Sequence, residues 1–178
     1  MEIDTIKQKL VECVLQLVHK DAYLLHNDIS ERAISHRLAV YLTPQFNDFD
    51  VDCEYNGNID ADNGRKYIYI LNARAKALGL RDINGGDDET TYRGVYPDII
   101  VHKRGKNGAE NNLLIIEIKK SSSLVNGDWD AEKLSRFTSS EYENRFDYRF
   151  GAFVMFNVGE RIGFTIEWYK DGQRFHDL

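Results

Sequence analysis

The sequence is poor in cysteine and has no long hydrophobic run. Cys13 and Cys53 are the two cysteines among 178 residues, and they form no metal-binding spacing. Both lie among apolar neighbours, which favours buried free thiols in a reducing cytosol over a disulfide. No apolar stretch approaches the length that crosses a membrane, and residues 1–4 do not begin a secretory signal. We therefore expect a cytoplasmic protein that does not contact a membrane.

An excess of positive charge is also absent. The chain has 23 Lys and Arg against 29 Asp and Glu, a formal net charge of −6. Proteins that bind nucleic acid tightly and without specificity are usually basic, so this charge argues against that class. Weak binding, a partner subunit, a homodimer or a small substrate stay open. With 42% hydrophobic residues, the chain has the composition and length of one globular domain over residues 1–178.

Two short segments in the middle of the chain predict a β-hairpin. Residues 96–102 and 113–120 are apolar and rich in β-branched side chains, as in buried strands. Residues 105–112 between them are turn formers and include the pair Asn107-Gly108. A hairpin centred on that pair places Asp98 opposite residues 117–119.

The hairpin brings charged side chains to one end of the sheet. Glu117 and Lys119 are two residues apart and share a face, while Ile118 points to the other face. Asp98 joins them, and two converging carboxylates suit a hard divalent cation such as Mg²⁺. A neighbouring lysine can orient or activate a water molecule. An Asp at a strand start and a Glu/Lys pair are each common, but charges at the end of so apolar a strand are unfavourable without a purpose.

Pro97-Asp98 followed by Glu117-Ile118-Lys119 on the next strand resembles the motif of the PD-(D/E)XK nuclease superfamily. The resemblance implies a metal-dependent endonuclease that hydrolyses phosphodiester bonds, with DNA favoured over RNA. It assigns Mg²⁺ or Mn²⁺ to Asp98, Glu117 and the Ile118 carbonyl, and catalysis to the same carboxylates and Lys119. The superfamily often adds an acid from a preceding helix, here Glu31. A capping box with Asp28 as N-cap and Glu31 at N3 explains that residue equally well.

The resemblance also implies an α/β (α+β) fold, with a restriction-endonuclease-like core in which helices flank a central mixed sheet. The periodicity predicts a helix over residues 3–26 and a second over about 29–43, then a strand at 51–55. An insertion over about 57–93 follows, in which 66–71 is either a strand or the opening of a helix through 78, and 83–90 is an acidic loop bordering the site. The two motif strands, a helix from residue 128 and strands at 148–156 and 162–169 complete the order. The superfamily core maps onto about residues 29–156.

Three basic residues are candidates for contacts with nucleic acid. Lys120 follows the motif strand, Lys133 lies on the helix after it, and Arg93 ends the insertion. A solvated face, or for Lys133 a local pair with Asp130, is the simpler explanation for each. Two further hypotheses stay open for the whole chain. One is a non-catalytic module of the same fold that binds nucleic acid or a protein partner, and the other is an unrelated fold in which the charged pair is incidental.

Overall fold

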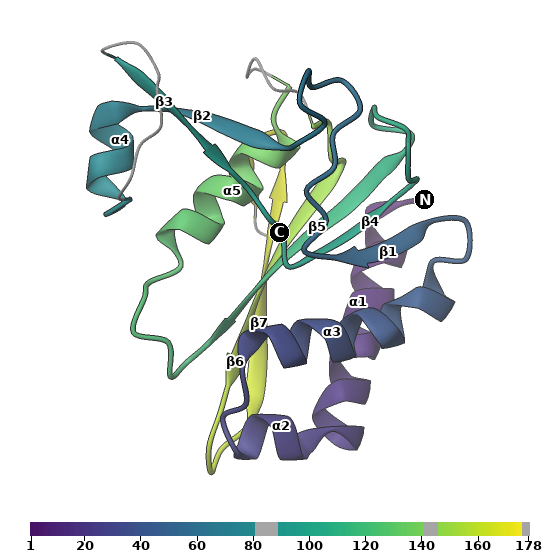
Figure 1. Cartoon of the computed structure of the whole chain (residues 1–178). Helices are drawn as coiled ribbons and strands as arrows, with labels where there is room; N and C mark the ends of the chain where they lie inside the picture. Colours follow the sequence, from purple (N-terminus) through teal and green to yellow (C-terminus); the bar gives the residue numbers. More distant parts are fainter. Residues whose placement is uncertain (81–88, 141–145, 176–178) are drawn as a thin grey trace.

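In the computed structural model, the chain forms a mixed six-stranded sheet covered by helices, with a separate two-stranded hairpin (Figure 1). The structure describes residues 1–80, 89–140 and 146–175. The sheet has the order β1-β4-β5-β6-β7-β8. Its strands are β1 (Asp50–Cys53), β4 (Ile99–His102), β5 (Asn112–Lys120), β6 (Phe150–Asn157), β7 (Gly163–Lys170) and β8 (Gln173–Phe175). The predicted α+β class and the order of its elements are confirmed.

Four helical segments precede the sheet, namely α1 (Ile3–Lys20), α2 (Ala22–His26), α3 (Glu31–Leu42) and the 3₁₀ turn η1 (Thr43–Gln45). The single helix predicted over residues 3–26 is interrupted at Asp21. The Asp21 carboxylate accepts hydrogen bonds from Arg37 Nε at 2.9 Å and from the Tyr41 hydroxyl, both on α3. These contacts between distant residues stabilise the break between α1 and α2. The helical periodicity of the sequence does not predict them.

The predicted capping box of α3 is wrong. Ser30 is the N-cap, and its Oγ accepts a hydrogen bond from the backbone N–H of Ala33 at 3.3 Å. Glu31 is therefore the first residue of the helix and not its third. Asp28 has a positive φ of 51° and pairs with Lys120 Nζ at 2.7 Å. Both Asp28 and Ser30 are good capping residues, and the contact with a distant strand decides between them.

Two hydrophobic cores lie on opposite faces of the sheet. Helices α1 and α3 cover one face, where they pack on Ile116 and Ile118 of β5. Helix α5 (Asp128–Thr138) covers the other face and packs on Ile115 of β5 and Phe153 of β6. Successive residues of β5 therefore enter different cores, and the strand is buried over most of its length.

Strand β6 is central, as its apolar sequence predicts. It pairs in parallel with β5 and antiparallel with β7. The short edge strand β8 has no counterpart in the sequence-based prediction. Among the described residues, no helix is long and apolar enough to cross a membrane.

The insertion forms a two-stranded antiparallel hairpin next to α5. Strands β2 (Tyr67–Leu71) and β3 (Thr90–Gly94) form the hairpin, and the short helix α4 (Asn72–Ala77) follows β2. Both readings of residues 66–78 are therefore partly right, since a strand runs directly into a helix. Most of the acidic loop predicted at 83–90 lies outside the described residues.

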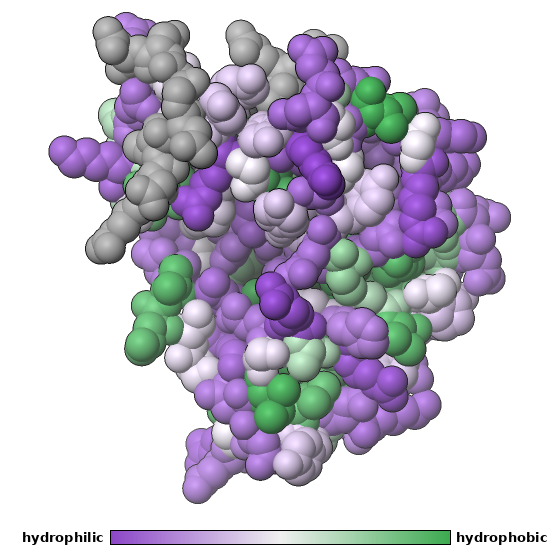
Figure 2. All heavy atoms as spheres, viewed as in Figure 1, coloured by the Kyte–Doolittle hydropathy of each residue, from purple (hydrophilic) through white to green (hydrophobic). Residues whose placement is uncertain are grey.

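The face of the molecule in Figure 2 is mostly hydrophilic, with scattered hydrophobic groups. Leu124 and Val125, in the loop between β5 and α5, are among the most exposed apolar side chains described. The loop belongs to no core cluster, so it is not packed as the neighbouring strands are.

Candidate active site

The hairpin register places Asp98 beside Glu117, as the sequence predicts. Strand β4 begins at Ile99, which pairs with Ile116, so the residue before Ile99 lies next to the residue after Ile116. The Glu117 side chain is completely buried on the face that α5 covers. The Asp98 carboxyl group lies close enough to that of Glu117 for the charge of one to raise the pKa of the other. Two carboxyl groups, one half-buried and one completely buried, thus lie close together just before the start of β4.

Strand β5 continues past the end of β4, and two carboxylates occupy the edge that is left free. The backbone N–H of Ile118 donates to Asp98 Oδ2 at 2.7 Å, and that of Lys120 donates to Glu31 Oε1 at 3.0 Å. The N–H and C=O groups of one strand residue point to the same side. The Ile118 carbonyl therefore lies on this edge, between the two N–H groups that Asp98 and Glu31 accept.

Three charged side chains complete the cluster around Glu117. Lys133 Nζ of α5 lies 2.6 Å from Glu117 Oε2 and 3.0 Å from Asp130 Oδ1. Lys119 Nζ lies 3.0 Å from the other oxygen of the Asp130 carboxylate. Asp98, Glu117 and Asp130 thus face two lysines, three carboxyl groups against two ammonium groups. We call these five residues the carboxylate–lysine cluster.

Burial and mutual repulsion shift the ionisation of this cluster. Burial raises the pKa of Glu117 well above its ordinary range, and the neighbouring Lys133 opposes the rise. Burial likewise raises the pKa of Asp98, against the hydrogen bond from the Ile118 backbone. Burial disfavours the charge on Lys133, but Glu117 and Asp130 outweigh it and raise the pKa of the ammonium group. The cluster therefore favours an added positive charge, from a proton or from a cation.

The donor groups of the cluster fit a hard divalent cation in part. The Glu117 Oε1 atom is buried and has no hydrogen-bond partner, which is unfavourable for a carboxylate oxygen unless something binds it. Asp98, Glu117 and the Ile118 carbonyl offer oxygen ligands of the kind that Mg²⁺ takes. However, across residues 1–80, 89–140 and 146–175 no three His, Cys, Asp or Glu side chains are grouped so as to hold a metal ion. A cation here would rest on two carboxylates and a carbonyl.

Glu31 was expected to join the carboxylate pair as a further ligand, and its position differs from that expectation. It is committed to the Lys120 N–H and is not grouped with Asp98 and Glu117 as a third acidic ligand. Its helix starts one residue after the Ser30 cap, which sets the carboxylate against the edge of β5. Glu31 therefore borders the cluster without belonging to it.

The three predicted basic contacts lie in different places. Lys133 reaches the cluster, as predicted for the helix after β5, and it also makes the local pair with Asp130. Lys120 pairs with Asp28 on the opposite face of β5. Arg93 lies over the ring of Trp129, with 5.7 Å between the guanidinium carbon and the ring centroid. Only Lys133 of the three is part of the cluster.

Asp130 is the functional candidate that sequence reasoning missed. The sequence suggested for it only a local pair with Lys133 on the same helix. In the structure it is buried and bridges two lysines from different elements. The three-residue spacing from Asp130 to Lys133 was visible in the sequence, but the contact with Lys119 depends on where α5 docks.

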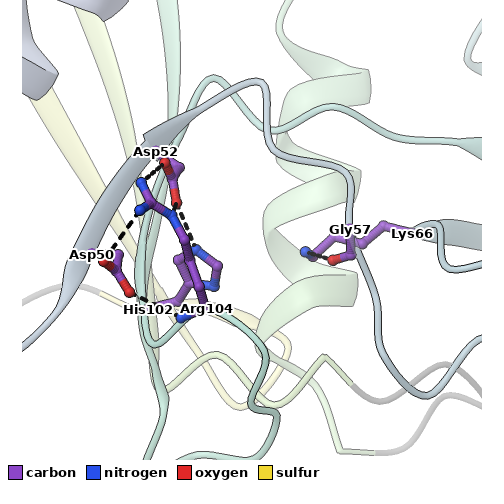
Figure 3. Close-up of polar contacts among 6 residues, drawn as sticks. All are labelled: Asp50, Asp52, Gly57, Lys66, His102 and Arg104. Carbon is purple, nitrogen blue, oxygen red and sulfur yellow. Dashed lines mark hydrogen bonds and ion pairs between the residues drawn. The ribbon is translucent and has the colours of Figure 1, made fainter.

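A second polar group occupies the other end of β1 and β4 (Figure 3). His102 Nε2 lies 3.0 Å from Asp52 Oδ2, and Arg104 also binds the Asp52 carboxylate. The nearby Lys66 ammonium group donates to the Gly57 carbonyl and lies over the ring of Tyr55. Burial lowers the pKa of His102, and Asp52 opposes that shift. His102 is almost completely buried and therefore not open to a substrate, and its contact with Asp52 links β4 to β1.

Comparison with known proteins identifies no relative. No protein-family model, no curated protein and no solved structure matches the chain. Function must therefore be argued from the carboxylate–lysine cluster itself.

Proposed function

We propose that this protein is a metal-dependent nuclease that hydrolyses phosphodiester bonds of nucleic acid, DNA in preference to RNA. The observation that carries the proposal is the position of the half-buried Asp98 beside the completely buried Glu117, with Lys119 on the same face of β5 as Glu117. Burial of a carboxyl group close to a second one is unfavourable for folding, so the retention of this pair favours a functional role.

The order of elements gives a second line of support. The PD-(D/E)XK core consists of a helix, three strands, a helix and a strand, and α3, β1, β4, β5, α5 and β6 follow that order. The motif residues fall on β5 and directly before β4, at the positions that the motif requires. Order and motif are partly independent, so their agreement strengthens the assignment to this superfamily.

The residues of the cluster would divide the work as follows. Asp98 and Glu117, with the Ile118 carbonyl, would hold Mg²⁺ or Mn²⁺. When bound, such an ion lowers the pKa of water and offsets charge that develops on the phosphate. Lys119 would donate hydrogen bonds to the attacking water and to a phosphate oxygen. Asp130 fixes the Lys119 ammonium group through their 3.0 Å ion pair, and Lys133 offsets the charge of Glu117 from α5.

One observation favours a second candidate, a non-catalytic module of the same fold. Lys133 occupies one oxygen of Glu117, and Asp130 engages both lysines, so most of the charge of the cluster is internally paired. A cluster satisfied in this way could serve as a structural remnant, and the protein would then bind nucleic acid or a protein partner without cutting it. The unpartnered Glu117 Oε1 and the intact motif weigh against this alternative.

The deciding experiment is a cleavage panel. Plasmid, single-stranded DNA, branched DNA and RNA are incubated with Mg²⁺, with Mn²⁺ or with EDTA. The wild-type protein is compared with Asp98→Ala and Lys119→Ala. We expect metal-dependent cutting by the wild type and a loss of at least about 100-fold in both variants, because each removes a group that acts on the reacting phosphate.

The matched control is Lys106→Ala, which removes an exposed lysine from the loop between β4 and β5. It should cut as the wild type does. A thermal-shift assay with Mg²⁺ accompanies the panel. If no substrate is cut and Mg²⁺ gives no shift that Asp98→Ala abolishes, the nuclease proposal fails and the non-catalytic module takes its place.

A further inference from the structure

The β2–β3 hairpin carries aromatic rings on the side that faces away from α5. In the register, Tyr69 pairs with Tyr92 and Tyr67 pairs with Gly94. The Tyr92 ring contacts those of Tyr69 and Tyr67, with centroids 5.9 Å and 5.4 Å apart. The alternate residues Ile68 and Ile70 are buried on the opposite side of the hairpin. The Tyr69 side chain is 44% exposed, so its ring lies at the surface of the hairpin.

A small cavity opens beside these rings. It has a volume of about 290 Å³ and lies between Tyr67, Tyr69, Arg65 and the polar turn of residues 58–63. Its lining therefore combines two tyrosines and one arginine with several Asn and Asp residues, and it is mostly polar. A flat ring with hydrogen-bonding edges matches both the size and the chemistry of such a cavity.

The polar turn is held in place by contacts to another part of the chain. The Asn107 amide, in the loop between β4 and β5, donates to Asn58 Oδ1 at 3.1 Å and to the Asp60 carboxylate. The Arg65 N–H donates to Asn63 Oδ1 at 3.0 Å. Asp62 makes no hydrogen bond or ion pair within the part of the chain that the structure describes. One carboxylate at the cavity is thus open to a ligand.

Two structural connections join the hairpin that borders the cavity to the carboxylate–lysine cluster. Gly94, opposite Tyr67, is four residues before Asp98, so the chain between their Cα atoms spans at most about 14 Å. Helix α5 supplies the second connection, because Arg136 donates to the Tyr69 carbonyl at 3.0 Å and Lys133 of the same helix binds Glu117. The hairpin that borders the cavity is therefore connected both to the chain that carries Asp98 and to the helix that binds Glu117.

We infer that the cavity beside Tyr67 and Tyr69 binds an unpaired nucleobase of the substrate strand. This inference rests on the proposed nuclease function and specifies its substrate as nucleic acid with a single-stranded region near the cleaved bond. In a duplex the base faces are stacked and paired, so they cannot lie against Tyr69. Asp60 and Asp62 repel phosphates, whereas Arg65 attracts them. The base therefore enters the cavity, and its phosphate lies beside Arg65 in the cavity wall.

The open Asp62 carboxylate adds a preference among bases. A carboxylate accepts a hydrogen bond from the exocyclic amino group of cytosine, which thymine lacks. Cytosine should consequently bind more tightly than thymine. Asp62→Asn should reduce that difference, because an amide offers the base both a donor and an acceptor.

The test measures binding and not cleavage, so that its failure is distinct from failure of the nuclease function. Fluorescence anisotropy is recorded in EDTA with labelled oligo(dC), oligo(dT) and a duplex, each of about 15 nucleotides per strand. We expect Tyr69→Ala to weaken oligo(dC) binding by at least about fivefold, since a stacked base contributes about 1–3 kcal/mol. The same variant should leave duplex binding unchanged.

Two controls separate stacking from folding. Tyr69→Phe keeps the ring and should bind oligo(dC) as the wild type does. Tyr23→Ala removes a tyrosine that is 71% exposed on α2 and should have no effect. If the wild type does not bind oligo(dC), or if Tyr69→Ala binds it as tightly as the wild type, the inference is overturned. Ring-dependent binding without any cleavage activity would uphold the base site in a non-catalytic protein.

Discussion

At the scale of single residues, Asp130 is the group that links the two lysines of the site. Each oxygen of its carboxylate lies 3.0 Å from a different ammonium group, one on β5 and one on its own helix. The side chain does not itself need to touch a substrate. Its effect on the reaction would come through the position of Lys119, which makes it a positioning residue.

Asp130→Asn should lower kcat by about 10- to 100-fold with little change in KM, because the neutral amide orients Lys119 less strictly while leaving substrate contacts in place. Steady-state cleavage kinetics measure both constants. The matched control is Glu132→Gln on the same helix, which pairs with Arg74 and Arg136 away from the cluster. An equal fall of kcat in both variants would mean that Asp130 acts only through the stability of α5.

Lys66, outside the carboxylate–lysine cluster, carries a charge that opposes folding. It is 5% exposed, and burial lowers the pKa of its ammonium group to about 8, with Asp52 opposing the shift. Between that value and the ordinary 10.5, the unfolded chain binds more protons than the folded one. The contribution of Lys66 to stability therefore increases as the pH rises through this window.

Lys66→Met removes that dependence. The free energy of unfolding of the variant minus that of the wild type should fall by about 3 kcal/mol between pH about 7 and pH about 10.5. Urea denaturation of both proteins at several pH values gives the difference directly. The buried Cys13 and the half-buried Cys53, whose pKa burial raises to about 11, titrate alike in both proteins and cancel. A difference that stays constant with pH would show that the Lys66 ammonium group is not penalised by burial.

At the scale of elements, α5 is the part on which the site depends most. It provides Asp130 and Lys133 to the cluster and holds the β2–β3 hairpin through Arg136 and Trp129. Its entry is tight, because Gly127 directly precedes it against the ring of Phe153. A Cβ atom at Gly127 would lie 2.6 Å from Phe153 Cζ.

Gly127→Ala should lower the free energy of unfolding by about 1–3 kcal/mol and reduce cleavage as well, since α5 must shift to relieve the overlap. Thermal denaturation and the cleavage assay measure the two effects. Gly163→Ala is the control, because its Cβ would meet nothing closer than Asn157 Nδ2 at 3.6 Å. If both variants keep wild-type stability, Phe153 has room to move and the entry to α5 is not constrained.

At the scale of the whole molecule, the charge of −6 limits how nucleic acid can be held. Of the three basic residues expected to contact it, Lys133 is buried, Lys120 is paired with Asp28, and Arg93 lies on Trp129. Binding should therefore depend more on base contacts, such as those at Tyr69, than on phosphate neutralisation.

A shallow salt dependence follows from this charge distribution. For single-stranded DNA, the slope of log K against log salt concentration is about −0.7 per neutralised phosphate. With three contacts or fewer, we expect a slope no steeper than about −2 between about 50 mM and about 200 mM salt. Anisotropy titrations with oligo(dC) in EDTA measure it. A much steeper slope would reveal a basic track that the described residues do not provide.

The local parts of the structure follow from short stretches of sequence. Strand β5 and the turn at Asn107-Gly108 follow from composition. Counting residues outward from that turn along both strands puts Asp98 beside Glu117. These predictions succeed because alternation and turn chemistry act over a few residues.

The contacts between distant elements depend instead on how the helices dock on the sheet. The bridge from Asp130 to Lys119, the choice of Ser30 over Asp28 as N-cap and the position of Glu31 on the edge of β5 all require α3 and α5 to be docked on the sheet. The cavity beside Tyr69 likewise needs the turn at 58–63 to be held by Asn107 from a separate hairpin. Docking of this kind depends on side-chain shape and burial summed over the whole chain, and no local pattern in the sequence carries that information.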